Sequence, residues 1–144
     1  FGLRTALDLL KAEGHEAVFA RHARHARATR AAVEAWGLEI FCSDPAARSN
    51  SLTAVLMPEG CSADRFRAAV RRRFGMALGN GLSKLRDRVF RIGHLGDFND
   101  TMLCATLSAL QSGLREVGIL SNRSGVDAAL AVLDEAAGST RAAT

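Results

Sequence analysis

The N-terminal part of the chain carries a helical pattern of apolar residues. Over residues 1–37 apolar positions such as Leu3 and Leu7 recur at helical spacing. Gly14 interrupts this pattern, and Gly37 follows its last turn. Because glycine favours the left-handed backbone at a helix end, the segment predicts two helices in series, or one bent helix, that end at Gly37.

The C-terminal part predicts two further helices. The first is expected to begin at Asn99 or Asp100, whose side chains are good N-caps, and its apolar residues alternate spacings of four and three. They are Leu103, Leu107, Leu110, Leu114 and Val117. The last helix is expected to begin after Ser124. Its predicted inward positions are Val126, Leu130 and Leu133.

Short apolar runs between these helices predict strands and one more helix. Residues 38–42 and 51–57 are expected to be strands, separated by polar turn residues around Pro45. Ser62 and Gly75 are suited to begin and end a helix. The apolar positions expected on one face of that helix are Phe66, Ala69, Val70 and Phe74.

Two more short runs complete the predicted sheet. Residues 76–78 and 88–92 flank a glycine-rich loop at 79–81, and together they predict a hairpin. The resulting order is helix, strand, strand, helix, strand, strand, helix, helix. It predicts an α+β fold in which helices cover one face of a small, mainly antiparallel sheet, after a long N-terminal helical segment.

The composition agrees with one globular domain. A chain of 144 residues with 48% hydrophobic residues can bury a core. We expect a helical segment at 1–37, a domain at 38–138 and a frayed tail at 139–144.

Three widely spaced cysteines without a ligand pattern favour a reducing, cytoplasmic location over a disulfide framework. No signal peptide or membrane-spanning run is recognisable, and a first residue Phe1 inside a helical pattern suggests a piece of a longer protein.

The positive charge is almost entirely arginine. The formal net charge is +4, and the only lysines are Lys11 and Lys84. Lys11 falls in a predicted helix and Lys84 in a polar loop. Neither position predicts the buried amine that a Schiff base requires. Arginines recur every third residue over 21–30 and fill 71–73. Because a period of three spreads around a helix and stacking aromatics are few, a solvated or interfacial face is favoured over a nucleic-acid surface.

Two other possible sites lack the spacing that their chemistry needs. His15, His22 and His25 share a helix, but no Cys, Asp or Glu at a matching distance completes a metal shell. The glycine-rich loop at 79–81 precedes a predicted strand, so its amides do not join a helix N-terminus as in phosphate-binding loops. We therefore assign no metal or phosphate site.

Arg91 is the one side chain that we assign to a ligand. It lies in a predicted strand that ends in a glycine-loosened turn before a helix. A guanidinium stays charged, and its planar fork of donors matches the two oxygens of a carboxylate. The alternative from the residues alone is an ordinary surface arginine.

The segments Ala-Leu-Gly-Asn-Gly-Leu-Ser-Lys-Leu at 77–85 and Phe-Arg-Ile-Gly-His-Leu-Gly-Asp at 90–97 resemble the C-terminal small domain of class V, fold-type I pyridoxal-phosphate aminotransferases. The similarity is strongest to the serine–glyoxylate and alanine–glyoxylate group. Residues 2–22 also resemble the inter-domain helix of that group. The resemblance covers nearly the whole chain.

The resemblance implies a function and a role for Arg91. Such enzymes use pyridoxal 5'-phosphate to move an amino group from serine or alanine to glyoxylate or pyruvate, and act as homodimers. Arg91 matches the family arginine that binds the substrate α-carboxylate and so orients the substrate. His94, in the same motif, is expected to stabilise the turn and to have no catalytic role.

The family's cofactor-binding residues have no counterpart here. The Schiff-base lysine, the acidic partner of the pyridine nitrogen and the phosphate-binding groups belong to a large domain that would precede Phe1. We therefore expect no tightly bound cofactor and no transaminase activity from this chain alone. The alternative is a free-standing α+β regulatory domain that binds a small carboxylate through Arg91, and the two readings differ in what lies upstream of Phe1.

Overall fold

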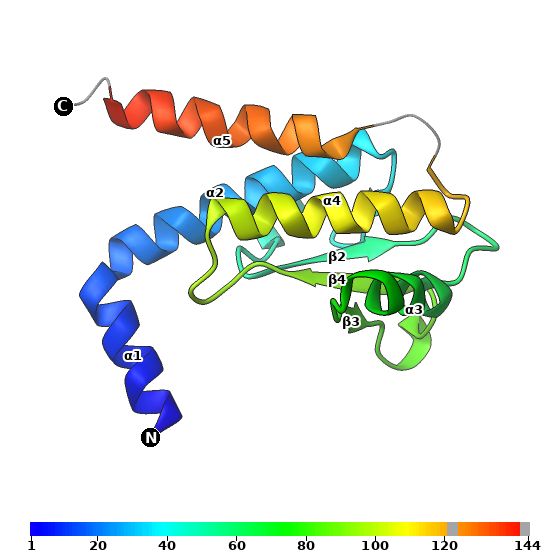
Figure 1. Cartoon of the computed structure of the whole chain (residues 1–144), viewed down its shortest axis with the longest axis horizontal. Coiled ribbons are helices and arrows are strands. Elements are labelled where there is room, and N and C mark those ends of the chain that lie inside the picture. Colours follow the sequence, from blue (N-terminus) through cyan, green and yellow to red (C-terminus); the bar gives the residue numbers. More distant parts are fainter. Residues whose placement is uncertain (121–123, 142–144) are drawn as a thin grey trace.

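Five α-helices and a four-stranded sheet make up the part of the chain that the structure describes (Figure 1). This computed structural model describes residues 1–120 and 124–141, and for 136–141 only the backbone. The helices are α1 (Gly2–Glu13), α2 (His15–Ala35), α3 (Ala63–Phe74), α4 (Asp100–Glu116) and α5 (Gly125–Arg141). The strands are β1 (Glu39–Ile40), β2 (Leu52–Leu56), β3 (Gly79–Asn80) and β4 (Val89–Gly93). Single 3-10 turns lie at Pro45–Ala47 and Ser83–Leu85.

The sheet has the order β1-β2-β4-β3, with every neighbouring pair antiparallel. In its register Val55 is opposite Phe90, and Ala54 is opposite Arg91. Val55 and Phe90 are fully buried, whereas Ala54 and Arg91 are partly exposed. Because side chains alternate between the two faces of a strand, one face of the sheet forms the core and Arg91 lies on the other.

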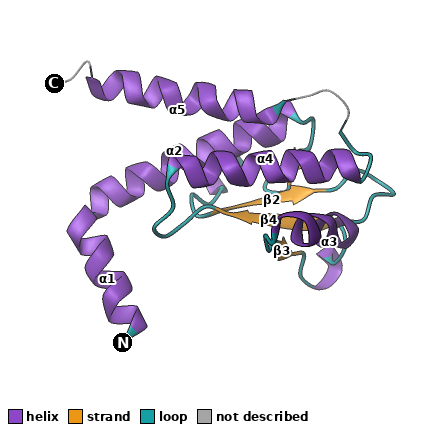
Figure 2. Ribbon diagram, in the orientation of Figure 1, coloured by secondary structure: helices purple, strands orange, loops and turns teal. Residues whose placement is uncertain are grey.

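The helices gather on the core face of the sheet. Helix α2 packs on β1 and β2, and α3 packs on β3 and β4. Helix α4 contacts α2, α3 and α5, while α5 lies along α2 as an outer layer (Figure 2). This arrangement confirms the predicted α+β fold with helices on one face of a small antiparallel sheet. None of the helices in the described residues is long and apolar enough to cross a membrane.

The helix boundaries follow the signals in the sequence. Gly14, with φ +90°, separates α1 from α2, and Gly37, with φ +77°, follows Trp36, the C-cap of α2. Ser62 Oγ accepts a hydrogen bond from the amide of Arg65, and Asn99 Oδ1 caps α4 in the same way. Side-chain capping of this kind satisfies helix amides that have no intrahelical partner, which is why these residues were predictable ends.

Two predictions about the strands were wrong. The run at 76–78 is not a strand, and β3 instead forms at Gly79–Asn80, where a loop was expected. Glycine is a poor strand former, but Gly79 is opposite Arg91 and its missing side chain leaves room for that residue. The predicted strand at 38–42 is shortened to Glu39–Ile40.

Two predicted inward side chains are exposed instead. Phe74 is 40% exposed, and the guanidinium of Arg73 lies 5.0 Å from the centre of its ring. Leu130 is also 40% exposed, whereas Ala129 beside it is completely buried. Helix α5 approaches α2 so closely that a Cβ on Gly125 would lie 2.5 Å from the carbonyl oxygen of Ala32, and Ala129 faces inward in place of Leu130, while Leu133 is buried as predicted. Of the expected tail, residues 142–144 lie outside the described part of the chain, and α5 extends to Arg141.

Candidate functional site

Arg91 occupies the middle of β4, on the sheet face opposite the helices. Its neighbours in the sheet are Ala54 on β2 and Gly79 on β3. Both neighbours are small, so the strand pairing surrounds the arginine with little side-chain bulk. The buried residues on either side of it, Phe90 and Ile92, anchor the strand in the core. The fold thus presents one arginine from a rigid strand, which is where a ligand-binding group is held most firmly.

The Arg91 side chain is held by β3. Its Nε donates a hydrogen bond of 3.0 Å to the carbonyl oxygen of Asn80. A Cβ built on Gly79 would lie 3.0 Å from both Cβ and Nε of Arg91. The side chain therefore runs directly over the Gly79 backbone, and a larger residue at 79 would displace it.

The outer part of the Arg91 guanidinium has no partner among the side chains that the structure describes. Among residues 1–120 and 124–135, no acidic side chain forms an ion pair with it, and its only hydrogen bond is the one from Nε. The two terminal amino groups together offer parallel N–H donors. Such a fork can bind one carboxylate through two charge-assisted hydrogen bonds.

His94 lies just beyond β4 and is completely buried. Its Nε2 is 3.0 Å from Thr53 Oγ1 on β2, and its backbone amide donates to Ser51. Burial lowers the pKa of His94 to about 4, so the ring is neutral near pH 7. A buried neutral ring that links β4 to β2 has a structural task, in keeping with the role that we expect for it.

The loop between β4 and α4 is fastened to α2 by Arg21. Its guanidinium donates to the carbonyl oxygens of Gly96 at 2.8 Å and Phe98 at 2.9 Å. The remaining donors form a bidentate pair with Glu13, at 2.7 and 2.6 Å. His22 Nε2 also accepts the amide of Gly96. This arginine is fully engaged, so it contributes to the shape of the loop and not to ligand binding.

A second link joins α2 to the start of α4. One oxygen of Asp100 lies 2.7 Å from Nη2 of Arg24 and 2.7 Å from Nε2 of the fully buried His25. Burial lowers the pKa of His25, and hydrogen bonding to Asp100 opposes that shift. The edge of this ring faces Phe98, with ring centres 5.9 Å apart.

Most of the basic residues of α2 therefore form hydrogen bonds or ion pairs that join this helix to other parts of the domain. Arg30 adds a hydrogen bond of 2.7 Å to the carbonyl oxygen of Ser49, while Arg27 is exposed. The sequence showed the arginines and histidines but not their partners, among which are the carbonyl oxygens of Gly96, Phe98 and Ser49, 19 to 77 residues away along the chain. Only a charged partner such as Asp100 could have been guessed from the sequence.

The other candidates from the sequence do not assemble into sites. Within the described residues, no group of three His, Cys, Asp or Glu side chains is arranged to hold a metal ion. Lys11 lies in the last turn of α1 and Lys84 in a 3-10 turn, and both are exposed. Neither provides a buried amine.

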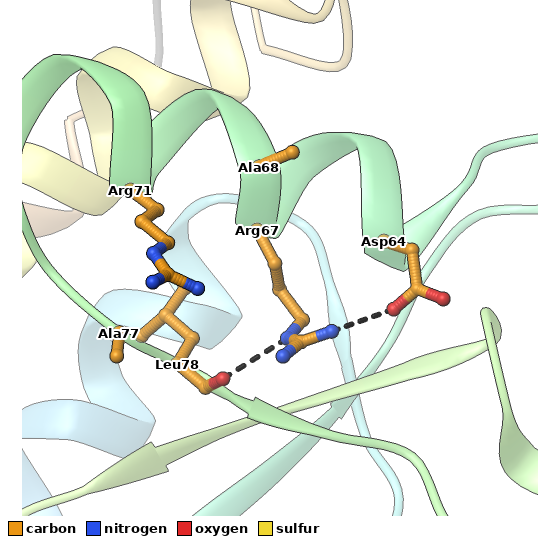
Figure 3. A pocket seen from close by; sticks show the side chains of 6 residues that line it. All are labelled: Asp64, Arg67, Ala68, Arg71, Ala77 and Leu78. Atoms are coloured by element: carbon orange, nitrogen blue, oxygen red, sulfur yellow. Dashed lines mark hydrogen bonds and ion pairs between the residues drawn. The ribbon is translucent and has the colours of Figure 1, made fainter.

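A shallow groove of about 210 Å³ lies between α3 and the segment before β3 (Figure 3). Arg67 is fixed there, donating to Asp64 at 2.6 Å and to the carbonyl oxygen of Leu78 at 3.0 Å. Arg71 extends into the groove, and makes no hydrogen bond or ion pair with the described side chains. The next two arginines pair with Glu116, so the run at 71–73 is partly neutralised instead of forming a continuous basic surface.

Comparison with known proteins identifies relatives over nearly the whole chain. No family model matches. A serine–glyoxylate aminotransferase of Hyphomicrobium methylovorum is 42% identical over 118 residues, which are 82% of this chain and 29% of that protein. A Synechococcus protein named as the small subunit of a soluble hydrogenase is 43% identical over 94% of this chain and 35% of its own length.

The fold comparison agrees with these sequence relatives. The crystal structure of a pyridoxamine–pyruvate aminotransferase from Mesorhizobium loti superposes with a TM-score of 0.85 and 38% identity. The match covers 93% of this chain and 35% of that one. The chain thus spans about a third of the length of the proteins that it matches.

Proposed function

This chain belongs to the class V aminotransferases and matches their C-terminal small domain in fold, and from that premise we propose that it binds the substrate carboxylate in a pyridoxal-phosphate-dependent aminotransferase. The proposed reaction transfers an amino group from serine or alanine to glyoxylate or pyruvate. The full-length enzyme is proposed to be a cytoplasmic homodimer. Three free cysteines support a reducing compartment.

The observation that carries the proposal is the free fork of Arg91. Its Nε is bonded to Asn80, its two terminal amino groups have no partner among the described residues, and it stands on the sheet face that the helices leave open. A carboxylate is the ligand that this geometry fits best. Binding of the carboxylate by Arg91 would orient the Cα–H bond of the substrate relative to the plane of the cofactor.

Pyridoxal phosphate does not fit the residues of this chain. The cofactor needs a lysine amine in a protected site, and both lysines here are exposed. When bound in the full-length enzyme, the cofactor would take up the electron pair left on the substrate's Cα when the Cα–H bond is broken. We therefore propose that the cofactor is held by the remaining part of such an enzyme, and that the 144 residues alone have no turnover.

The test replaces Arg91 with lysine in the full-length enzyme that contains this chain. Lysine keeps the charge but loses the paired donors, so we expect KM for the amino donor to rise about 10- to 100-fold. Reaction of L-serine with glyoxylate would be followed by formation of hydroxypyruvate. Arg71→Lys is the matched control, because Arg71 is exposed and makes no hydrogen bond or ion pair with the described side chains.

Two results would contradict the proposal. An unchanged KM in Arg91→Lys would remove the arginine from substrate binding. Turnover by the isolated 144-residue chain, with added cofactor, would show that the catalytic groups lie within it.

A further inference from the structure

We propose that β3 is a positioning element for Arg91: the bare backbone of Gly79 and the carbonyl group of Asn80 orient the guanidinium so that its two terminal amino groups face one carboxylate. This inference rests on the proposed function. It assigns no chemical step to β3. Gly79 and Asn80 act through Arg91, as positioning residues.

The first contribution to the orientation of Arg91 is the free space over the backbone of Gly79. Gly79 and Arg91 are direct partners in the β3–β4 pairing, where a side chain on each would stand side by side. A Cβ on Gly79 would lie 3.0 Å from Cβ, 3.0 Å from Nε and 3.5 Å from Cζ of Arg91. The guanidinium thus lies against the glycine backbone itself, and any other residue would push it away. The φ angle of Gly79 is outside the left-handed region, so space and not backbone freedom explains this glycine.

The second contribution is the carbonyl oxygen of Asn80. It accepts the hydrogen bond from Nε at 3.0 Å, which uses the inner donor of the guanidinium. Because the guanidinium is planar, fixing Nε also fixes the direction of the two terminal amino groups. An arginine held in this way loses less side-chain freedom when a ligand binds.

The third contribution holds β3 itself in place. Gly81 is buried, and a Cβ there would lie 1.9 Å from the carbonyl oxygen of Leu85 and 3.1 Å from that of Val89. The loop from 82 to 88 therefore folds directly onto the end of β3. With this contact β3 cannot drift from β4, and the Asn80 carbonyl stays at its position beside Arg91.

Support of Arg91 accounts for the short strand β3, which forms where the sequence predicts a loop. Two residues of poor strand propensity pair with β4 at the single point where Arg91 needs support. One of the two pairs formed by β3 places Gly79 directly opposite Arg91, so the pairing holds the support beside the arginine.

The experiment compares Gly79→Ala with Gly93→Ala in the full-length enzyme. Gly93 is likewise a glycine of the sheet, at the end of β4, but a Cβ there meets nothing closer than 3.6 Å, so the same methyl group fits without displacement. We expect Gly79→Ala to raise KM for the amino donor about tenfold with a smaller change in kcat, and Gly93→Ala to leave KM within about twofold.

A double substitution separates positioning from a general loss of structure. If Gly79 acts through Arg91, adding Gly79→Ala to Arg91→Lys will raise KM little beyond Arg91→Lys alone. Additive effects of the two substitutions would overturn the inference. So would a KM in Gly79→Ala that equals that of Gly93→Ala while Arg91→Lys remains impaired, and in that case the proposed function would stand. An unimpaired Arg91→Lys would instead overturn the proposed function itself.

A measurement on the unsubstituted enzyme keeps the inference testable if Gly79→Ala does not fold. The Nε–H proton of Arg91 should exchange with water at least about ten times more slowly than that of Arg71, because Arg91 donates its Nε–H to a carbonyl group and the Arg71 side chain makes no hydrogen bond with the described residues. Equal exchange rates at the two arginines would overturn the orientation by Asn80.

Discussion

At the residue scale, what distinguishes the arginines of this chain is how many of their donors are already used. The guanidinium of Arg21 donates hydrogen bonds to two carbonyl groups and one carboxylate, and its side chain is only 16% exposed. Within the described part of the chain, Arg91 uses only its Nε donor. Both are half-buried arginines near the same loop. Their sequence positions alone therefore could not show which of them holds the loop in place and which is free to bind a ligand. The resemblance pointed to Arg91, and the hydrogen bonds give the physical reason that it is suited to the task.

The buried ring of His94 predicts a loss of stability in acid. Its pKa is lowered to about 4 in the folded chain, whereas an unfolded histidine titrates near 6.5. Between these values the unfolded chain binds a proton that the folded chain does not bind. The contribution of His94 to the free energy of unfolding should therefore be level above about pH 6.5 and fall by about 3 kcal/mol as the pH drops to 4.

Urea unfolding of the 144-residue chain at a series of pH values measures this effect. The His94→Gln variant keeps a side chain able to bond Thr53 and should lose this part of the pH dependence. His15→Gln, at an exposed position, should retain it. A His94→Gln curve parallel to that of the unsubstituted chain would refute the assignment.

At the element scale, helices were predicted better than strands. Caps and stops such as Ser62, Asn99 and Gly14 act on neighbouring residues, so a local signal is enough to place a helix end. β3 has no such signal, because its pairing depends on Arg91, twelve residues along the chain, and not on its own propensity. The exposure of Leu130 has the same kind of cause, since the close approach of another helix decides which side of α5 faces inward.

The crossing of α3 and α4 predicts that Gly113→Ala will destabilise the fold. Alanine is the better helix former by about 1 kcal/mol, but a Cβ at 113 would lie 2.6 Å from Val70 Cγ2 and 3.1 Å from the ring of Phe66. That ring packs edge-on against Phe90, with centres 4.8 Å apart, and has little room to move. We expect a net loss of about 1–3 kcal/mol, measured by urea unfolding.

Ser108→Ala is the matched control for this prediction. Ser108 lies in the same helix but is exposed, so alanine there should leave the stability unchanged or slightly raised. A stabilised Gly113→Ala variant would show that α3 and α4 can separate without cost.

At the scale of the whole molecule, the body of the domain is joined through α2. This helix packs on the sheet, contacts α5 on its outer side and fastens the loop after β4 through Arg21 and His22. Helix α1 differs from it, because α1 contains no buried residue and extends away from the body of the domain (Figure 1). The sequence predicted the helix from its periodicity, but periodicity alone does not say what an apolar face packs against.

The exposed apolar face of α1 predicts that the 144-residue chain associates with itself in solution. Leu3 is 75% exposed, Leu7 44% and Phe19, at the start of α2, 62%. Apolar residues gathered in this way are covered in most proteins, and a second copy is the partner available to a purified chain. Sedimentation velocity should show the fraction of larger species rising with concentration. Replacing Leu3 and Leu7 by glutamate should reduce that fraction at least about fivefold, whereas glutamate at the similarly exposed Leu82, remote from α1, should not. If the chain stays monomeric at high micromolar concentration, the prediction that the apolar face of α1 drives self-association is wrong.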